Sequence, residues 1–268
     1  MNETLKRALS GLVYVVLLIF ATHFSKITFL ILFGFFLLQT VLEYCRIANL
    51  SAITASLLSV LLYLLFGCYF YVNESIDMAL VALSLFVSFR LMLWLFYNSK
   101  IPNDNFSKWV KLIGYIILPF VFIAKIGNFV GVFNPSLIIG AFILIWTNDT
   151  FAYIVGKSIG KNKLFELISP KKTVEGFIGG LIFSIFVSIL LAIYFFDNGI
   201  IYWIFTAAIV SVFGTIGDLV ESKFKRVAKI KDSGNIMPGH GGLLDRLDSI
   251  IFVAPFLFLF YKIVYYVS

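Results

Sequence analysis

Residues 174–196 read VEGFIGGLIFSIFVSILLAIYFF, a run whose only charged residue is Glu175. An α-helix rises about 1.5 Å per residue, so about 20 apolar residues cross the roughly 30 Å hydrocarbon core of a bilayer. The run is apolar all round and not along one stripe, which is typical of a membrane span and not of a surface helix in a soluble protein.

Comparable runs fill the rest of the chain. Its 268 residues are 61% hydrophobic and only 13% charged, whereas soluble domains are about 45–50% apolar and about 25% charged. We therefore expect an all-α, polytopic integral membrane protein that forms one membrane domain over residues 1–268, with about nine transmembrane helices. The first two are short for a bilayer, so we expect a tilted or incompletely spanning hairpin around Lys26. The expected spans are 10–23, 27–42, 52–72, 77–97, 109–124, 130–153, 174–196, 200–219 and 249–267.

The basic residues predict the orientation, because lysine and arginine near span ends resist translocation. With these spans, one side carries almost all of them and the other side only Lys26, Lys125 and Lys262, while Arg90 lies within a span. We expect the N-terminus in the cytosol, the C-terminus outside, and cytosolic loops at 156–173 and 220–248. Positive-inside bias and attraction to anionic lipids explain the net charge of +7 equally well without an enzyme.

Two acidic residues stand where a charge is costly. Asp149 lies within the expected sixth span, and Asp218 lies at the cytosolic end of the eighth. At a helix C-terminus, Asp218 would oppose the macrodipole and favour a compensating cation, and Glu221 shares its helix face. An internal ion pair for Asp149 and ordinary interfacial solvation for Asp218 are the structural alternatives.

A polar segment, 222–248, separates the last two spans. It contains a basic arm with Lys225, Arg226, Lys229 and Lys231, a glycine-rich turn over 234–242 able to approach phosphate oxygens, and two carboxylates, Asp245 and Asp248, on one face of the next helix. Oxygen-only ligands suit Mg²⁺, which binds one or two carboxylates together with substrate phosphates.

The loop before the seventh span contributes a second anion-binding candidate. Ser169 is expected to cap a helix with Pro170 at its first position, followed by Lys171, Lys172 and Thr173. A capped span with lysines reaching to the interface is the structural alternative. Gly176 and Gly180 form a GxxxG pair, which indicates a helix-packing face.

The segment 222–248 resembles the signature of the phosphatidate cytidylyltransferases, also called CDP-diacylglycerol synthases. The Asn148–Asp149 and 169–176 stretches are also similar to that family, whereas the first hundred residues match it only in hydropathy. The matching positions of the signature are Ser222, Lys225, Arg226, Lys231, Asp232, Gly234, Pro238, His240, Gly241, Gly242, Asp245, Arg246 and Asp248.

The resemblance implies transfer of the cytidylyl group of CTP to phosphatidate, giving CDP-diacylglycerol and pyrophosphate, with Mg²⁺ and, as in some family members, K⁺ as a second ion. It implies Asp218 and Asp245 as metal ligands, and we expect Asp149 and Asp248 beside them as nearby ligands or orienting residues. The expected catalytic residues are Asp218, Asp245, Asp248, Lys225 and Arg226. The expected substrate-binding residues are Ser169, Lys171, Lys172, Thr173, Lys231, Asp232, His240, Gly241, Gly242 and Arg246.

These expectations assign the chemistry to helices in 129–268, while helices in 1–128 carry little functional signal. A CTP-dependent polyprenol or dolichol kinase is the nearer rival, and an ion transporter or channel using Asp149 and Asp218 is the more distant one. No nucleic-acid partner is expected, because no recognition helix or RNA-binding aromatic pattern accompanies the lysines. Short loops without an appended soluble domain favour a bacterial inner-membrane enzyme with its active site on the cytosolic face, and a homodimer is the assembly considered.

Overall fold

The computed structural model describes residues 3–69, 73–97, 104–196, 199–237, 239 and 241–267, and within them the protein is almost entirely helical. Seven helical segments of this part of the chain are long and apolar enough to cross a membrane, and two shorter apolar helices cover Leu9–Phe24 and Ala52–Cys68. The polytopic all-α class is therefore confirmed. The seven segments are α2 (Lys26–Ala48), α4 (Glu74–Tyr97), the continuous Asn105–Gly127, α7 (Pro135–Ile159), α8 (Val174–Tyr194), α9 (Ile200–Val227) and α10 (Leu244–Val267).

The remaining elements complete the bundle. The chain begins with α1 (Glu3–Phe24), and α3 (Ala52–Leu62) continues into a π-helical turn, η1 (Tyr63–Cys68). The segment Asn105–Gly127 consists of α5 (Asn105–Lys111), the π-helical η2 (Leu112–Ile117) and α6 (Leu118–Gly127), and it is followed by η3 (Phe129–Gly131).

Several expected boundaries were wrong because tertiary contacts extend the helices beyond their apolar cores. The second span is not short: α2 has 23 residues, and its last turns are held by buried Glu43 and Tyr44. The eighth span does not end at 219, because α9 runs to Val227 and buries Lys223, which donates a hydrogen bond to the Trp94 carbonyl. Asp218 is consequently inside α9 and not at its C-terminus, and the loop to α10 begins only at Ala228.

The expected helix start at Ser169 was also wrong. Ser169–Thr173 forms strand β2, which pairs antiparallel with β1 (Lys163–Phe165), so backbone pairing replaces the predicted helical turn. Proline is tolerated at the edge of such a two-stranded hairpin. The cap of α8 is Thr173, whose hydroxyl accepts a hydrogen bond from the Gly176 N–H at 3.1 Å.

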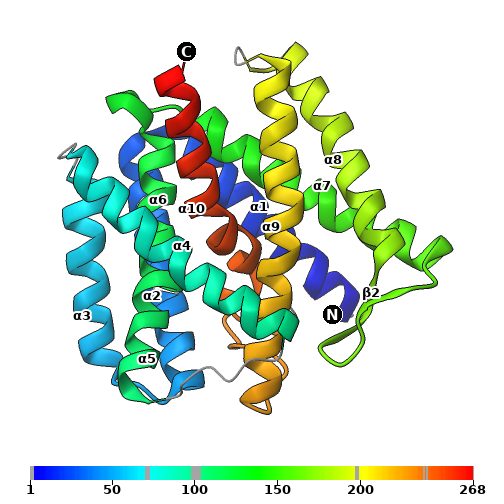
Figure 1. The fold of residues 1–268 in the computed structure, drawn as a ribbon, viewed down its shortest axis with the longest axis horizontal. Coiled ribbons are helices and arrows are strands. Elements are labelled where there is room, and N and C mark those ends of the chain that lie inside the picture. The colour runs from blue at the N-terminus through cyan, green and yellow to red at the C-terminus, as the bar shows by residue number, and fades with distance from the viewer. Residues whose placement is uncertain are drawn as a thin grey trace.

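Close helix packing places the chemistry-bearing segments side by side. A Cβ at Gly180 would lie 2.7 Å from the Asn148 carbonyl oxygen, and one at Gly176 would lie 2.6 Å from that of Ala152, so α7 and α8 meet backbone to backbone as the GxxxG pair predicts. In Figure 1, α7, α8 and α9 lie together on one side of the bundle and α10 runs through its middle. The C-terminal end of α10 is at the top, whereas the hairpin and the α9–α10 loop lie toward the bottom.

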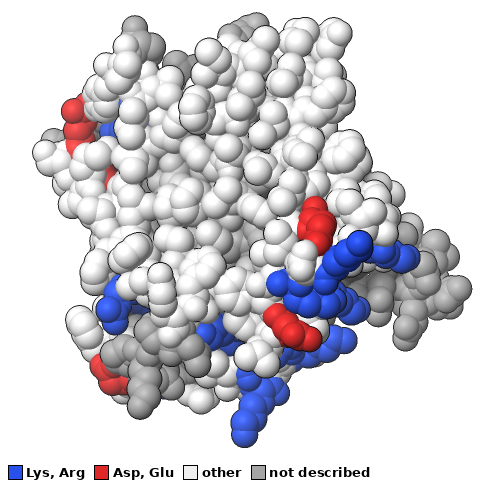
Figure 2. Space-filling view, turned by 45° about the vertical axis from the view of Figure 1, so that its right-hand side comes forward, with Lys and Arg blue, Asp and Glu red and all other residues white. Residues whose placement is uncertain are grey.

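Charge is concentrated at one end. In Figure 2 the blue side chains gather at the lower end, most of the remaining surface is white, and one small patch of both signs is visible at the upper left. Large apolar side chains such as Phe20, Ile31 and Ile182 are exposed along the helices. A bilayer around these helices would cover such side chains, which agrees with an integral membrane protein.

Candidate active site

A cavity of about 400 Å³ lies between α7, β2, α9 and α10, at the end of the molecule that carries most of the lysines and arginines. The cavity brings together residues of the 169–176 stretch and of the 222–248 segment, which were expected to converge. Most of the predicted site residues line it: Asp149, Lys171, Lys172, Thr173, Asp218, Lys225, Asp232, Asp245, Arg246 and Asp248.

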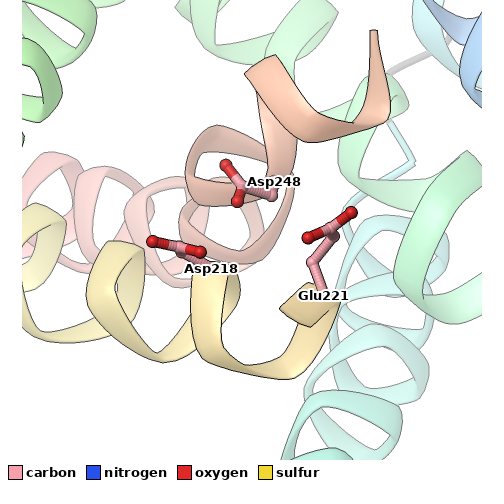
Figure 3. Close-up of side chains that lie close together, drawn as sticks. All are labelled: Asp218, Glu221 and Asp248. Atoms are coloured by element: carbon pink, nitrogen blue, oxygen red, sulfur yellow. The ribbon is translucent and has the colours of Figure 1, made fainter. Parts of the chain in front are cut away.

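Three carboxylates face one another beside this cavity, and we call Asp218, Glu221 and Asp248 the acidic cluster. Asp218 and Glu221 are one turn apart on α9, and Asp248 projects toward them from α10 (Figure 3). One oxygen of each lies within 4.8 Å of the others. Glu221 and Asp248 are buried, and the Glu221 Oε1 atom has no partner among the described residues.

Such a cluster fits a hard cation. Three like charges this close repel one another strongly at low dielectric, and carboxylate oxygens are the ligands that Mg²⁺ prefers. The available oxygen of Glu221 is unexplained by protein contacts alone. The cluster differs from the predicted metal ligands, since it includes Glu221 and lacks Asp149 and Asp245, while Asp248 was expected beside the metal.

Two lysines partly neutralise the acidic cluster. Lys172 of β2 forms an ion pair with Asp218, and Lys225 of α9 lies 2.6 Å from Glu221 Oε2. Burial lowers the pKa of Lys172, but the neighbouring Asp218 carboxylate more than offsets this, so the pKa lies above its ordinary value. Lys172 is therefore a fixed positive charge at the cavity wall at neutral pH.

Asp149 extends the acidic wall from α7. Its side chain is exposed and lines the cavity, and its Oδ1 accepts a hydrogen bond from the neighbouring Asn148 amide at 3.5 Å. The expected alternative of an internal ion pair is not observed for Asp149 within the described residues. Asp149 is thus placed to interact with a cavity ligand.

Asp245 has a different environment from the acidic cluster. Its Oδ1 receives the Lys225 ammonium at 2.7 Å. Its Oδ2 accepts hydrogen bonds from the backbone N–H and the hydroxyl of Ser233, both at 2.9 Å, and from the Gly242 N–H at 2.7 Å. Asp245 therefore ties the loop before α10 to α9.

Glu43 holds the same loop from the opposite side, and sequence reasoning missed it. This residue of α2 is only 3% exposed. It accepts hydrogen bonds from the Ser233 hydroxyl at 2.8 Å, the Leu243 N–H at 2.9 Å and the Leu244 N–H at 2.8 Å. The last two donors open α10, so Glu43 caps that helix from a distance. We call Glu43 and Asp245 the loop anchors; an acidic residue near the end of an apolar run was the available signal for Glu43.

The glycines of the loop are required by this packing. Gly241 has a φ of +83°, which favours glycine, and a Cβ there would lie 2.6 Å from Asp245 Oδ2. A Cβ at Gly242 would collide with the Ser233 hydroxyl and the Glu43 carboxylate. The glycines predicted to approach phosphates thus also let the loop anchors reach the backbone.

The other predicted residues lie around the rim. Ser169 opens β2, and Arg226 and Lys231 are exposed, with the Arg226 guanidinium donating to the Ile168 carbonyl at 3.5 Å. None of these three lines the cavity. His240 lies outside the described residues, so its predicted role is untested.

A second cavity, of about 260 Å³, is lined in part by the same carboxylates. Asp149, Asp245, Arg246 and Asp248 line both cavities. The second also contacts apolar side chains of α1 and α7, among them Val15, Phe142 and Trp146. The site is therefore open to a polar ligand on one side and bordered by apolar side chains on the other.

The chain belongs to the cytidylyltransferase family, which it matches over residues 5–264. It is 35% identical to the phosphatidate cytidylyltransferase of Bacillus subtilis over 268 aligned positions, covering 96% of this chain and 97% of that protein. It is 53% identical to the phosphatidate cytidylyltransferase of Staphylococcus haemolyticus and 54% to that of Staphylococcus saprophyticus, each over 122 residues. Those two matches span 45% of this chain and 46% of the relatives' length.

Proposed function

We propose that this protein transfers the cytidylyl group of CTP to phosphatidate, forming CDP-diacylglycerol and releasing pyrophosphate. Family membership and the full-length similarity to the Bacillus subtilis protein support the reaction. A phosphate oxygen of the lipid bonds to the α-phosphorus of CTP, the bond between the α-phosphorus and the bridging oxygen breaks, and pyrophosphate leaves with the electron pair.

The observation that carries this proposal is the acidic cluster beside two cavities that share Asp149, Asp245, Arg246 and Asp248, with Lys172 next to it and with Phe142 and Trp146 adding apolar side chains to one of the two cavities. The reaction must bring an anionic lipid phosphate against a highly charged nucleotide. A site that combines carboxylates for a cation with fixed ammonium groups addresses this repulsion directly.

A divalent cation, with Mg²⁺ the best fit to an all-oxygen site, would be held by Asp218, Glu221 and Asp248, while Asp149 lines the same cavity as Asp218 and Asp248. When bound, such an ion supplies charge neutralisation on phosphate oxygens. Asp245 retains its predicted importance through the loop that it anchors. A K⁺ ion beside the divalent ion is the further expectation from the family resemblance.

The protein's own groups then bind and orient the substrates. Lys171, Lys172 and Arg246 present positive charge along the polar cavity, where the triphosphate would lie. The apolar border at Phe142 and Trp146 would receive the glycerol and the first carbons of the acyl chains, while the rest of the lipid stays in the leaflet. The lipid phosphate is largely ionised at pH 7, since its second pKa is about 6, and needs little help from a base.

We place the site at the cytosolic face of a bacterial inner membrane, with the N-terminus in the cytosol. The clustering of basic side chains at the cavity end in Figure 2 supports this orientation. Cysteine-accessibility labelling at Lys163 and Lys229 would contradict the single cytosolic site if the two positions were labelled from opposite faces.

Position-specific labelling of CTP tests the reaction. Purified protein with phosphatidate and CTP labelled at the α-phosphate should transfer label to the lipid, whereas CTP labelled at the γ-phosphate should release label only as pyrophosphate. Lipid labelled from the γ-phosphate would establish a kinase instead. Equal turnover with all four ribonucleoside triphosphates would refute CTP specificity.

A further inference from the structure

A further cavity, of about 280 Å³, lies at the other end of the molecule and is lined by charged and aromatic side chains. It is bordered by α4, α6 and α10. Lys262 follows Asp248 of the acidic cluster by 14 positions along α10, which corresponds to about 21 Å at the rise of an α-helix. The cavity therefore lies most of a hydrocarbon thickness away from the acidic cluster and is separate from the candidate active site.

Three charged side chains converge in it from three helices. Lys125 lies 2.8 Å from Asp77 Oδ1, and Lys262 lies 3.4 Å from Asp77 Oδ2. All three residues are less than 9% exposed. A single buried carboxylate thus serves two buried ammonium groups, and the other acid that lines the cavity, Glu74, is exposed at its edge. The two lysines therefore retain N–H donors that Asp77 alone does not satisfy.

Asn128 adds an independent observation. Its side chain is 5% exposed and lines the same cavity, yet neither its amide nitrogen nor its carbonyl oxygen has a partner among the described residues. A buried amide normally has its hydrogen bonds satisfied. Two N–H donors and one acceptor are therefore available to a ligand that also satisfies the lysines.

The remaining lining indicates the kind of ligand. Phe129, Phe258 and Tyr265 give the cavity an aromatic wall, and exposed Glu74, bound by the Tyr266 hydroxyl, stands beside it. Aromatic rings around a polar group are typical of the membrane interface. Moreover, Lys125 and Lys262 are two of the three basic residues expected on the side that the positive-inside bias depletes, so that bias does not explain them.

We propose that this cavity binds the phosphate of a membrane phospholipid headgroup in the leaflet opposite the active site. Lys125 and Lys262 contact the phosphate oxygens, the Asn128 amide donates to the same group, and the aromatic wall packs against the glycerol. Glu74 favours a headgroup with an amine beyond the phosphate. A free phosphate ion would offer the same contacts to the lysines and Asn128 but none to the aromatic wall or Glu74.

Purified, delipidated full-length protein can be titrated separately with phosphatidylethanolamine, phosphatidylglycerol and inorganic phosphate. Native mass spectrometry counts bound lipid, and the rise in thermal unfolding temperature reports all three ligands. We expect binding of both lipids, tighter for phosphatidylethanolamine, and about tenfold weaker binding in Lys262→Met and in Asn128→Leu, the cost of losing one charge-assisted hydrogen bond. Lys26→Met, which removes a lysine elsewhere at the same end, is the matched control and should bind normally.

The Asn128→Leu variant distinguishes a lipid-binding role of this cavity from a purely structural one. It removes the unpartnered amide without touching the ion pairs, so a structural site would become equally or more stable and its lipid binding would not change. Unchanged lipid binding in both variants would overturn the proposal. Phosphate binding with the same variant dependence but no lipid binding would support the anion contacts and assign the site to free phosphate. CTP turnover should be unaffected by Asn128→Leu, so these outcomes do not depend on the proposed reaction.

Discussion

The acidic cluster and the loop anchors are neighbouring groups of carboxylates with opposite environments. Glu43 and Asp245 each accept hydrogen bonds from several protein donors, including backbone N–H groups of the loop and of the first turn of α10. Among the described residues, one oxygen of Glu221 in the acidic cluster accepts no hydrogen bond, and Asp218 pairs with Lys172 and accepts a hydrogen bond from the Ser222 hydroxyl. Proximity alone therefore does not define a ligand site. Carboxylates whose oxygens accept several hydrogen bonds from the protein maintain the structure, whereas carboxylates with few protein donors are available to bind a ligand.

The largest expected effect comes from Asp218→Asn. Removing this charge weakens the acidic cluster without breaking a loop contact, so turnover should fall about 10²–10³-fold, as when a group that stabilises transition-state charge is removed. The thermal unfolding temperature should fall only slightly, because loss of the ion pair with Lys172 is offset in part by weaker repulsion within the acidic cluster. Both are measured on detergent-purified protein, and near-normal turnover would refute the assignment of Asp218 to the metal site.

Asp245→Asn should lower both activity and stability. The substitution removes the charge that Lys225 and three other donors share, and breaking a partly buried pair of this kind costs about 3–5 kcal/mol. We expect turnover to fall because the loop is displaced, and we expect the protein to unfold at a lower temperature than the parent protein. An unchanged transition with lost turnover would move Asp245 from the loop anchors to the ligand group, as the sequence first predicted.

Glu43→Gln tests the anchor that lies outside the signature. A glutamine has only one acceptor oxygen for three donors, so at least one buried donor loses its partner, at about 1–3 kcal/mol. Turnover should fall about tenfold as the loop loosens, although Glu43 does not line either cavity of the site. Glu166→Gln, an exposed acid in the hairpin, is the matched control and should change neither quantity. A Glu43→Gln protein as stable as the control would show that the loop needs no support from α2.

The smallest effect is expected from Lys172→Arg. The pKa of Lys172 is raised in the folded protein above the ordinary lysine pKa of 10.5. The ion pair with Asp218 therefore contributes its full stability below pH 10.5, and this stability is lost only as the pH rises through the higher pKa of the folded state. Between pH 7 and pH 9 the parent protein and Lys172→Arg should therefore show parallel unfolding temperatures and parallel activity profiles. Lys172→Met should lose activity at every pH in this range. A transition of the parent protein near pH 8 that Lys172→Arg abolishes would contradict the assigned charge state.

Much of the site was predictable because it depends on local spacing. The i, i+3 relation put Asp245 and Asp248 on one helix, and their place beside an intramembrane Asp218 followed from hydropathy. The sequence could not predict that Asp245 holds the loop while Asp248 belongs to the acidic cluster, because this depends on which hydrogen-bond donors of the loop reach each carboxylate oxygen. Glu43 was missed since its partners lie about 200 residues away. The helix start at Ser169 was wrong because pairing with β1 competes with a local capping pattern.

The position of Glu43 has a consequence for biogenesis. Chains are synthesised from the N-terminus, so α2 is made long before Leu243 and Leu244, whose backbone groups Glu43 will accept. Until then, the Glu43 carboxylate lacks its three final hydrogen-bond donors and is costly to bury among neighbouring helices. We therefore expect α2 to reach its final packing only when the α9–α10 loop and the start of α10 bind Glu43.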